Sequence, residues 1–298
     1  MKKSSRFVSP KILALVMGIL LMLGIGFATG GLRTGFKQAI LTATFLRAQW
    51  NSYGFGVTPV KPLQTRISEV DGMPLVYVPA GEFEMGTDDI GFPPSQPLHT
   101  VKLNAFWIDQ YEVSNAQFAL CVEAKKCRMP SKQVYKQYFD PAYADYPVVY
   151  VAWKDALAYC TWAGRTLPTE AQWEKAARGT DGRHYPWGNE LPDTSRANFD
   201  DILGKTVPVN RYPLGASPYG AFNMAGNVRE WVADWYGENY YSQSPTENPT
   251  GPELGHYRSL RGGSYGDALR QMEVYTRFKH QPTLPGINRG FRCAQPAP

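Results

Sequence analysis

The sequence predicts an α+β fold, in which helices and strands occupy separate stretches of the chain. Helical patterns gather between residues 114 and 179, whereas short strand-like pieces come before them and dominate after residue 180. This segregation is typical of α+β domains, since helices and strands alternate along the chain in α/β domains. The counts of Trp (8), Tyr (18), Gly (28) and Pro (24) further indicate a loop-rich domain held by aromatic packing.

Strand-like segments open the domain. The run 75–78 is short and apolar, and residues 81–86 alternate with Phe83 and Met85 on one face, as in a hairpin. Residues 101–108 repeat this strand-like character.

Three helices are predicted from caps and glycine stops. Ser114 caps the first, with Gln117 at the third position of a reciprocal capping box. The second runs over 153–163 and ends at Gly164, and the third starts at Thr169 and ends at Gly179.

The N-terminus predicts a membrane anchor. A basic segment, 1–11, precedes an uncharged apolar run over 12–31 that is long enough to cross a bilayer as a helix. By the positive-inside rule the N-terminus stays in the cytoplasm. We therefore expect a single-pass protein of a bacterial-type cytoplasmic membrane, with its domain in the periplasm or outside the cell. A cleaved signal peptide is the alternative, because Ala28 and Gly30 are small residues at the preferred spacing.

Residues 32–66 are predicted as a partly helical stalk or linker, and the folded domain as 67–298. An apolar face at helical spacing within 35–53 fits a stalk, or alternatively a partner contact or a membrane-surface helix. Glycines and prolines over 54–66 break regular structure before the domain begins.

Charge and cysteine count limit the class of protein. The formal net charge of +5 owes much to the first 47 residues, so the domain has no basic stripe and nucleic-acid binding is not expected. Four cysteines, an even count, suit an oxidising compartment and allow three disulfide pairings.

An ordered series of motifs resembles the formylglycine-generating enzyme family, also called sulfatase-modifying factor domains. The resemblance covers residues 70–296 and is most specific in the middle and at the end of the chain. Its motifs are 76–83, 85–86, 106–109, 111–118, 147–149, 158–160, 167–174, 176–179, 185–189, 223–231, 261–265 and 290–293.

The resemblance implies a single compact α+β domain, poor in regular secondary structure and related in topology to C-type lectins. In family members Cys160 and Cys293 would pair, which leaves Cys121 and Cys127 for each other. Both bridges would be structural.

The resemblance also implies where chemistry should occur. Formylglycine generators hold copper(I) between two cysteines that follow a Gly-Gly-Ser motif, and soft thiolates suit that metal. The corresponding positions here are Asp267 and Met272, so we expect neither copper nor formylglycine formation. Asp267 could act as an acid or base, or simply form a salt bridge with a nearby arginine. The cleft candidates are Ser264, Tyr265, Asp267, Arg270 and Arg277.

Structural calcium is the other implied feature, because calcium takes carboxylate, amide and carbonyl oxygens. Asn223 and Glu230 would give side-chain oxygens, and Gly226 and Val228 would give carbonyls. A second, weaker site would use Asn198, Phe199 and Asp201. Alternatively, Glu230 only bonds to backbone amides.

Three functions are compatible with these features. We favour a non-catalytic accessory domain that docks onto another extracytoplasmic or membrane protein and helps it assemble or mature. The alternative is a tailoring enzyme, oxidoreductase-like, that uses the repurposed cleft on an exported peptide or precursor. A glycan- or peptide-binding module is third.

Overall fold

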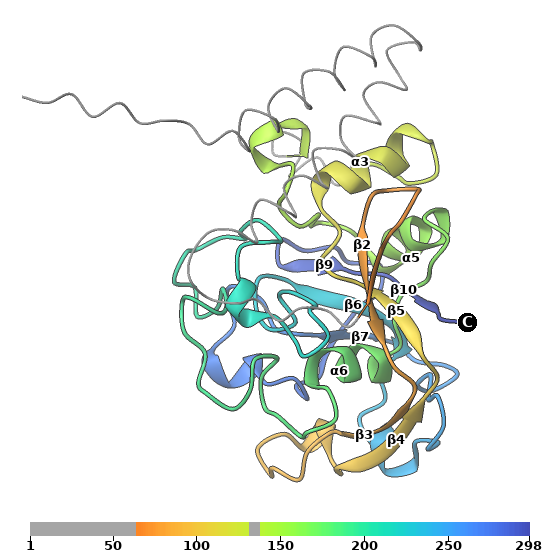
Figure 1. The fold of residues 1–298 in the computed structure, drawn as a ribbon, viewed down its shortest axis with the longest axis vertical. Coiled ribbons are helices and arrows are strands. Elements are labelled where there is room, and N and C mark those ends of the chain that lie inside the picture. Colours follow the sequence, from red (N-terminus) through yellow and green to blue (C-terminus); the bar gives the residue numbers. More distant parts are fainter. Residues whose placement is uncertain (1–63, 131–137) are drawn as a thin grey trace, which may run out of the picture. The chain divides into compact units, whose positions relative to one another are not determined.

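The computed structural model describes residues 64–130 and 138–298 (Figure 1). The predicted basic segment 1–11, the predicted anchor 12–31 and almost all of the stalk 32–66 lie outside the described residues. The described part is an α+β domain with few helices, as predicted.

The first sheet joins the two ends of the domain. It contains β1 (Thr65–Ile67), β2 (Pro74–Val78), β5 (Phe106–Asp109) and β10 (Ala294–Pro296), in the order β1-β2-β5-β10 with antiparallel pairing throughout. Val76 lies opposite Ile108, and neither side chain is exposed. The last strand of the chain therefore closes against strands near its start.

A two-stranded sheet, β3 (Gly81–Met85) with β4 (His99–Leu103), confirms the predicted alternation. Phe83 lies opposite Val101, and both are buried. The single strand-like run predicted over 101–108 is instead shared by β4 and β5. It breaks at Asn104, whose backbone N–H donates to Asn248 Oδ1 (2.9 Å), a partner that sequence periodicity could not reveal.

The third sheet has the order β8-β7-β6-β9. Its strands are β6 (Arg229–Trp235), β7 (Arg258–Arg261), β8 (Phe278–His280) and β9 (Arg289–Phe291). Among its pairs only β6 and β9, which lie side by side in Figure 1, run parallel. Their register places Arg229 beside Arg289 and Trp231 beside Phe291.

The three predicted helices are confirmed as α3 (Asn115–Glu123), α5 (Trp153–Trp162) and α6 (Glu170–Arg178). Ser114 and Thr169 form the capping boxes with Gln117 and Gln172. Gly179 ends α6 at a φ of 73°, a conformation that favours glycine. The described residues also form short 3₁₀ helices, namely η2 (Pro93–Ser95), η4 (Pro141–Tyr143), η5 (Pro213–Gly215), η6 (Tyr240–Gln243) and η7 (Leu269–Met272).

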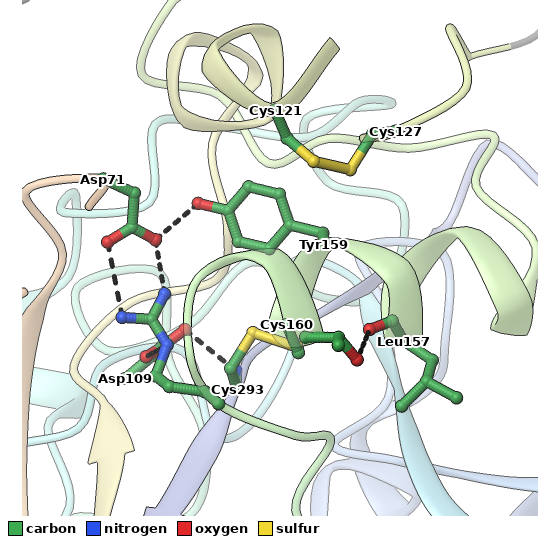
Figure 2. Close-up of a disulfide and its surroundings, with 10 residues drawn as sticks. Asp71, Asp109, Cys121, Cys127, Leu157, Tyr159, Cys160 and Cys293 are labelled. Carbon is green, nitrogen blue, oxygen red and sulfur yellow. Dashed lines mark hydrogen bonds and ion pairs between the residues drawn. A yellow bond between two sulfur atoms is a disulfide. The ribbon is translucent and has the colours of Figure 1, made fainter. Parts of the chain in front are cut away.

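Both implied disulfides are present, which confirms the pairing (Figure 2). Cys160–Cys293 ties α5 to the segment between β9 and β10 across 133 positions of sequence, and Cys121–Cys127 closes the end of α3. Beside the first bridge, Asp71 accepts from Tyr159 Oη (2.6 Å) and pairs with Arg165. These groups are buried, so the bridge lies in a fully packed region.

The predicted membrane localisation needs correction. Within residues 64–130 and 138–298, no helix is long and apolar enough to span a bilayer. The prediction relied on the segment 12–31, which lies outside the described residues. Sequence hydropathy measures only how apolar a segment is, not whether it forms a spanning helix.

Candidate functional site

Asp267 lies at the position that corresponds to the family's reactive centre, and its carboxylate is already fully bonded. Arg229 Nε donates to Asp267 Oδ2 (2.8 Å), and a second guanidinium nitrogen of Arg229 bonds to Oδ1. Ser264 donates to Oδ2 from both its backbone N–H (2.8 Å) and its hydroxyl (2.7 Å). Ser264 has no exposed surface and Asp267 only 6%, so this pair is enclosed.

The remaining cleft candidates bond elsewhere. Arg270 reaches Asp89 at the surface (3.2 Å), and Arg277 pairs with buried Glu170 (2.7 Å). The backbone carbonyl of Tyr265 accepts a hydrogen bond from the N–H of Asp201 (2.7 Å). Asp267 does form a salt bridge, but with Arg229. The arginines nearer to it in the sequence, Arg270 and Arg277, are not its partners.

Arg277 belongs to a buried ion network beneath α6. Glu170 accepts from Arg277 and from Arg261 (3.0 Å), and Arg261 also bonds to Glu174. Each of these side chains is at most 3% exposed. Arg277 and Arg261 lower the pKa of Glu170 and outweigh the opposing effect of its burial. Such a closed network has a structural role, since every charge in it has a partner.

Met272 lies at the second reactive position and serves as packing. Its unexposed side chain belongs to a small cluster with Tyr185, Ala197, Phe199 and Ala225. All four cysteines of the chain are in disulfides, so no thiolate remains at either position. A carboxylate bound by arginine and a buried thioether cannot reproduce a dithiolate copper site.

The predicted calcium loop, 223–230, surrounds a buried polar cluster. Asn223 and Asn227 each donate an amide N–H to Glu112, over 2.7 and 2.9 Å. Glu230 accepts from Arg292 Nη2 (2.7 Å), Arg292 Nε (2.7 Å) and Trp173 Nε1 (2.7 Å). Glu230 therefore bonds to side chains. The alternative to a calcium site, in which Glu230 bonds to backbone amides, is wrong about its partners.

The amide oxygens of the predicted ligands are suited to calcium. Asn223 Oδ1 and Asn198 Oδ1 are both buried, and each lacks a hydrogen-bond partner among the described residues. An unsatisfied buried acceptor is costly, and a cation would remove that cost. In the described chain no group of three or more His, Cys, Asp or Glu side chains is placed so that it could hold a metal ion, but the predicted set uses mainly amide and carbonyl oxygens.

The two loops that carry the predicted ligands meet where Asn227 N–H donates to the backbone carbonyl of Asn198 (2.9 Å). Gly226 and Val228 are buried on the 223–230 loop, and Gly226 N–H donates to Gly262 O (2.7 Å). Phe199 is buried against Met272, whereas the Asp201 side chain is exposed. The second predicted calcium site therefore offers one buried side-chain oxygen ligand and one at the surface.

Sequence reasoning missed Glu112, Arg229 and Arg292 as members of these sites. Burial, followed by the charge of Glu230, raises the pKa of Glu112 to about 8. Each of the three residues stands inside a quoted motif (111–118, 223–231 and 290–293), but as part of the resemblance rather than as a site. Their partners are more than 35 positions away, so local spacing gave no signal.

Two concave regions are present near the predicted helices. A groove of about 740 Å³ follows α5 and is lined by Lys126, Trp153, Lys154, Leu157, Ala158, Thr161 and Trp162. A cavity of about 60 Å³ is lined in part by the tyrosines Tyr138, Tyr143 and Tyr146. The second is too small for most ligands, which occupy about 300 Å³ or more.

Comparisons with known proteins agree with the motif pattern. The model of the sulfatase-modifying factor enzyme 1-like domain matches residues 62–297. The formylglycine-generating enzyme of Streptomyces coelicolor is 36% identical, over 74% of this chain and 89% of that enzyme. The inactive C-alpha-formylglycine-generating enzyme 2 of Mus musculus is 32% identical, over 75% and 86%.

A protein kinase and a solved structure are also similar to the chain. The serine/threonine-protein kinase pkn1 of Chlamydia caviae is 36% identical over 74% of this chain, but the match spans only 38% of the kinase. The structure of PvdO from Pseudomonas aeruginosa superimposes with a TM-score of 0.67 and 26% identity, over 80% of this chain and 99% of PvdO.

Proposed function

The chain belongs to the sulfatase-modifying factor enzyme 1-like domain family, and we propose that it is a non-catalytic member that docks onto another protein and helps it assemble or mature. The proposal rests on the side chains that stand at the family's two reactive positions. Asp267 is bound by Arg229 and Ser264, and Met272 is buried in an apolar cluster. A relative whose name calls it inactive is compatible with such a role.

The groove along α5 is the docking surface that we propose. Trp153, Leu157 and Trp162 are only partly buried, and Lys126 and Lys154 flank them. Aromatic side chains are enriched in protein interfaces, and unpaired cations select a partner of opposite charge. The proposed occupant is therefore a partner polypeptide that presents an apolar side chain beside acidic residues.

The Ser264–Asp267 pair has no catalytic role in the proposed function. A tailoring enzyme would need a reactive group that a substrate can reach, and both side chains are enclosed. The enzyme alternative therefore has less support than docking.

We further propose that calcium is a structural ion of the domain. Asn223 would hold it through Oδ1, with the carbonyls of Gly226 and Val228. Both carboxylate oxygens of Glu230 already accept from Arg292 or Trp173, so Glu230 is left out of the proposed ligands. The second site would use Asn198, Phe199 and Asp201. The two unpartnered buried amide oxygens, Asn223 Oδ1 and Asn198 Oδ1, are the support for this assignment.

Two measurements test the proposed function. The purified chain is incubated with a cysteine peptide from a sulfatase, copper and oxygen, beside the Streptomyces coelicolor enzyme as positive control. Mass spectrometry should detect formylglycine only with the control enzyme. Formylglycine made by this chain would refute the non-catalytic role.

The docking surface is tested by charge reversal. Lys154→Glu should abolish stoichiometric co-purification of a partner without changing the melting temperature, because Lys154 is exposed. Arg211→Glu, which reverses another exposed cation, is the matched control. Equal loss in both variants, or in neither, would count against the groove.

A further inference from the structure

Arg289 is an arginine without an acidic partner in the described structure. Its Nε is buried without a hydrogen-bond partner, and its one described side-chain bond is a long contact from Nη1 to Leu284 O (3.5 Å). The salt bridges of the described residues do not include it. The buried Nε has lost its hydration without gaining a hydrogen bond, and an anion bound to the guanidinium would reduce that cost.

The undescribed parts of the chain cannot supply the missing carboxylate. Residues 1–63 and 131–137 contain no Asp or Glu at all. An anion for Arg289 must therefore come from outside the chain or from a change in the described fold.

Parallel pairing places a second arginine beside the first. Arg229 in β6 and Arg289 in β9 are register partners in neighbouring parallel strands, so their side chains project from the same face of the sheet. Arg229 stacks over the Phe278 ring at 4.1 Å, and its charge is paired with Asp267. Burial and then the charge of Arg229 lower the pKa of Arg289.

The surroundings are positive overall. Burial, followed by Arg289 and Arg229, lowers the pKa of His280. Asp267 is the one carboxylate bonded to this group, and it is shared by Arg229 and Ser264. Two guanidinium groups thus have a single carboxylate near them, and Arg229 is the one bonded to it, which leaves Arg289 uncompensated.

The loop before β9 passes close to the Arg289 side chain and adds apolar surface. A Cβ at Gly286 would collide with the guanidinium, so a larger residue there would displace the end of the Arg289 side chain. On the same loop Leu284 and Ile287 are 48% and 52% exposed. An apolar group next to the cation would cover these two side chains.

We propose that Arg289, supported by Arg229, binds the carboxylate of a ligand that also carries an apolar group. The planar guanidinium fork matches a carboxylate in two parallel hydrogen bonds, which a compact ammonium cannot do. This site would exist whether or not the α5 groove docks a partner.

Calorimetry or NMR titration of the purified full chain tests the site with hexanoate, hexanamide and inorganic phosphate at matched ionic strength. Hexanoate should bind saturably, and its neutral analogue hexanamide should not. Arg289→Gln should weaken hexanoate binding about tenfold, as expected for the loss of a charge-assisted hydrogen bond. Lys279→Gln removes a charge from the exposed position beside His280 and should leave the affinity unchanged.

Equal binding of hexanoate and hexanamide, a preference for phosphate, or full affinity in Arg289→Gln would overturn the proposal. Should Arg289→Gln fail to fold, Arg289→Lys decides the question. This variant retains the charge without the planar fork and should bind hexanoate more weakly than the wild type. Undiminished affinity in Arg289→Lys would refute recognition by the fork.

Discussion

Arg229 donates from Nε to Asp267 Oδ2 over 2.8 Å, so the acid at the family's reactive position is held in an ion pair. The two residues are 38 positions apart and come from β6 and the loop after β7. The Asp267 side chain is 8% exposed and that of Arg229 is 20% exposed. This burial makes the pair a structural element that can be tested by mutation.

Asp267→Ala should lower the free energy of unfolding by about 2 kcal/mol, because it leaves Arg229 largely buried without its carboxylate. Urea denaturation measures the loss. The double variant Arg229→Ala/Asp267→Ala should lose less than the sum of the single variants, since neither partner is then left unpaired. A single variant that stays fully stable but abolishes the biological function would instead indicate a reactive aspartate.

The two disulfides should differ in their contribution to stability. Replacing Cys160 and Cys293 by alanine opens a loop of 133 residues, which the chain-entropy model values at about 5 kcal/mol. The loop of 6 residues between Cys121 and Cys127 is valued at about 2 kcal/mol. Thermal and urea unfolding of the two double variants should follow this order, and the reverse order would contradict the entropic explanation.

Glu112 should make the protein less stable as pH rises. Its pKa rises from the ordinary glutamate value of 4.5 to about 8 on folding, because of burial and the charge of Glu230. The native state therefore binds the proton more tightly than the unfolded chain does. The resulting stability is complete below about pH 4.5 and is lost as pH rises through about 8.

Glu112→Gln should flatten this pH dependence by an amount on the order of 4 kcal/mol between pH 5 and pH 8.5. The measurement is urea unfolding in the presence of a chelator. Burial also raises the pKa of Asp109 to about 7 and that of Asp234 to about 8, so the wild type retains other contributions. The difference between variant and wild type isolates Glu112, and an unchanged slope would show that Glu112 is ionised in the native state.

Calcium should raise the melting temperature and a chelator should lower it, since binding to the native state alone stabilises that state. At a free concentration 100 times the dissociation constant the gain is about 2.7 kcal/mol. Asn223→Ala should remove most of the response, because it deletes an unpartnered buried oxygen. Asn239→Ala, at an exposed asparagine, is the matched control. A wild type that does not respond to calcium would contradict the proposed ion.

The local structure was largely readable from the order of residues. Ser114–Gln117 and Thr169–Gln172 are capping boxes because both partners lie within one helical turn. The alternation around Phe83 and Met85 likewise predicted β3. The boundary between β4 and β5 was missed, since the contact from Asn104 to Asn248 spans 144 positions.

By itself, the sequence determined the helix caps, the α+β order of elements, the absence of a cysteine pair at the reactive positions and the lack of acidic residues in 1–63. These properties are local or compositional. Tertiary structure alone decided that Asp267 pairs with Arg229 and that Arg229 lies beside Arg289. Parallel pairing of β6 and β9 joins segments 60 positions apart, and such pairing depends on how the whole core packs, which no local pattern records.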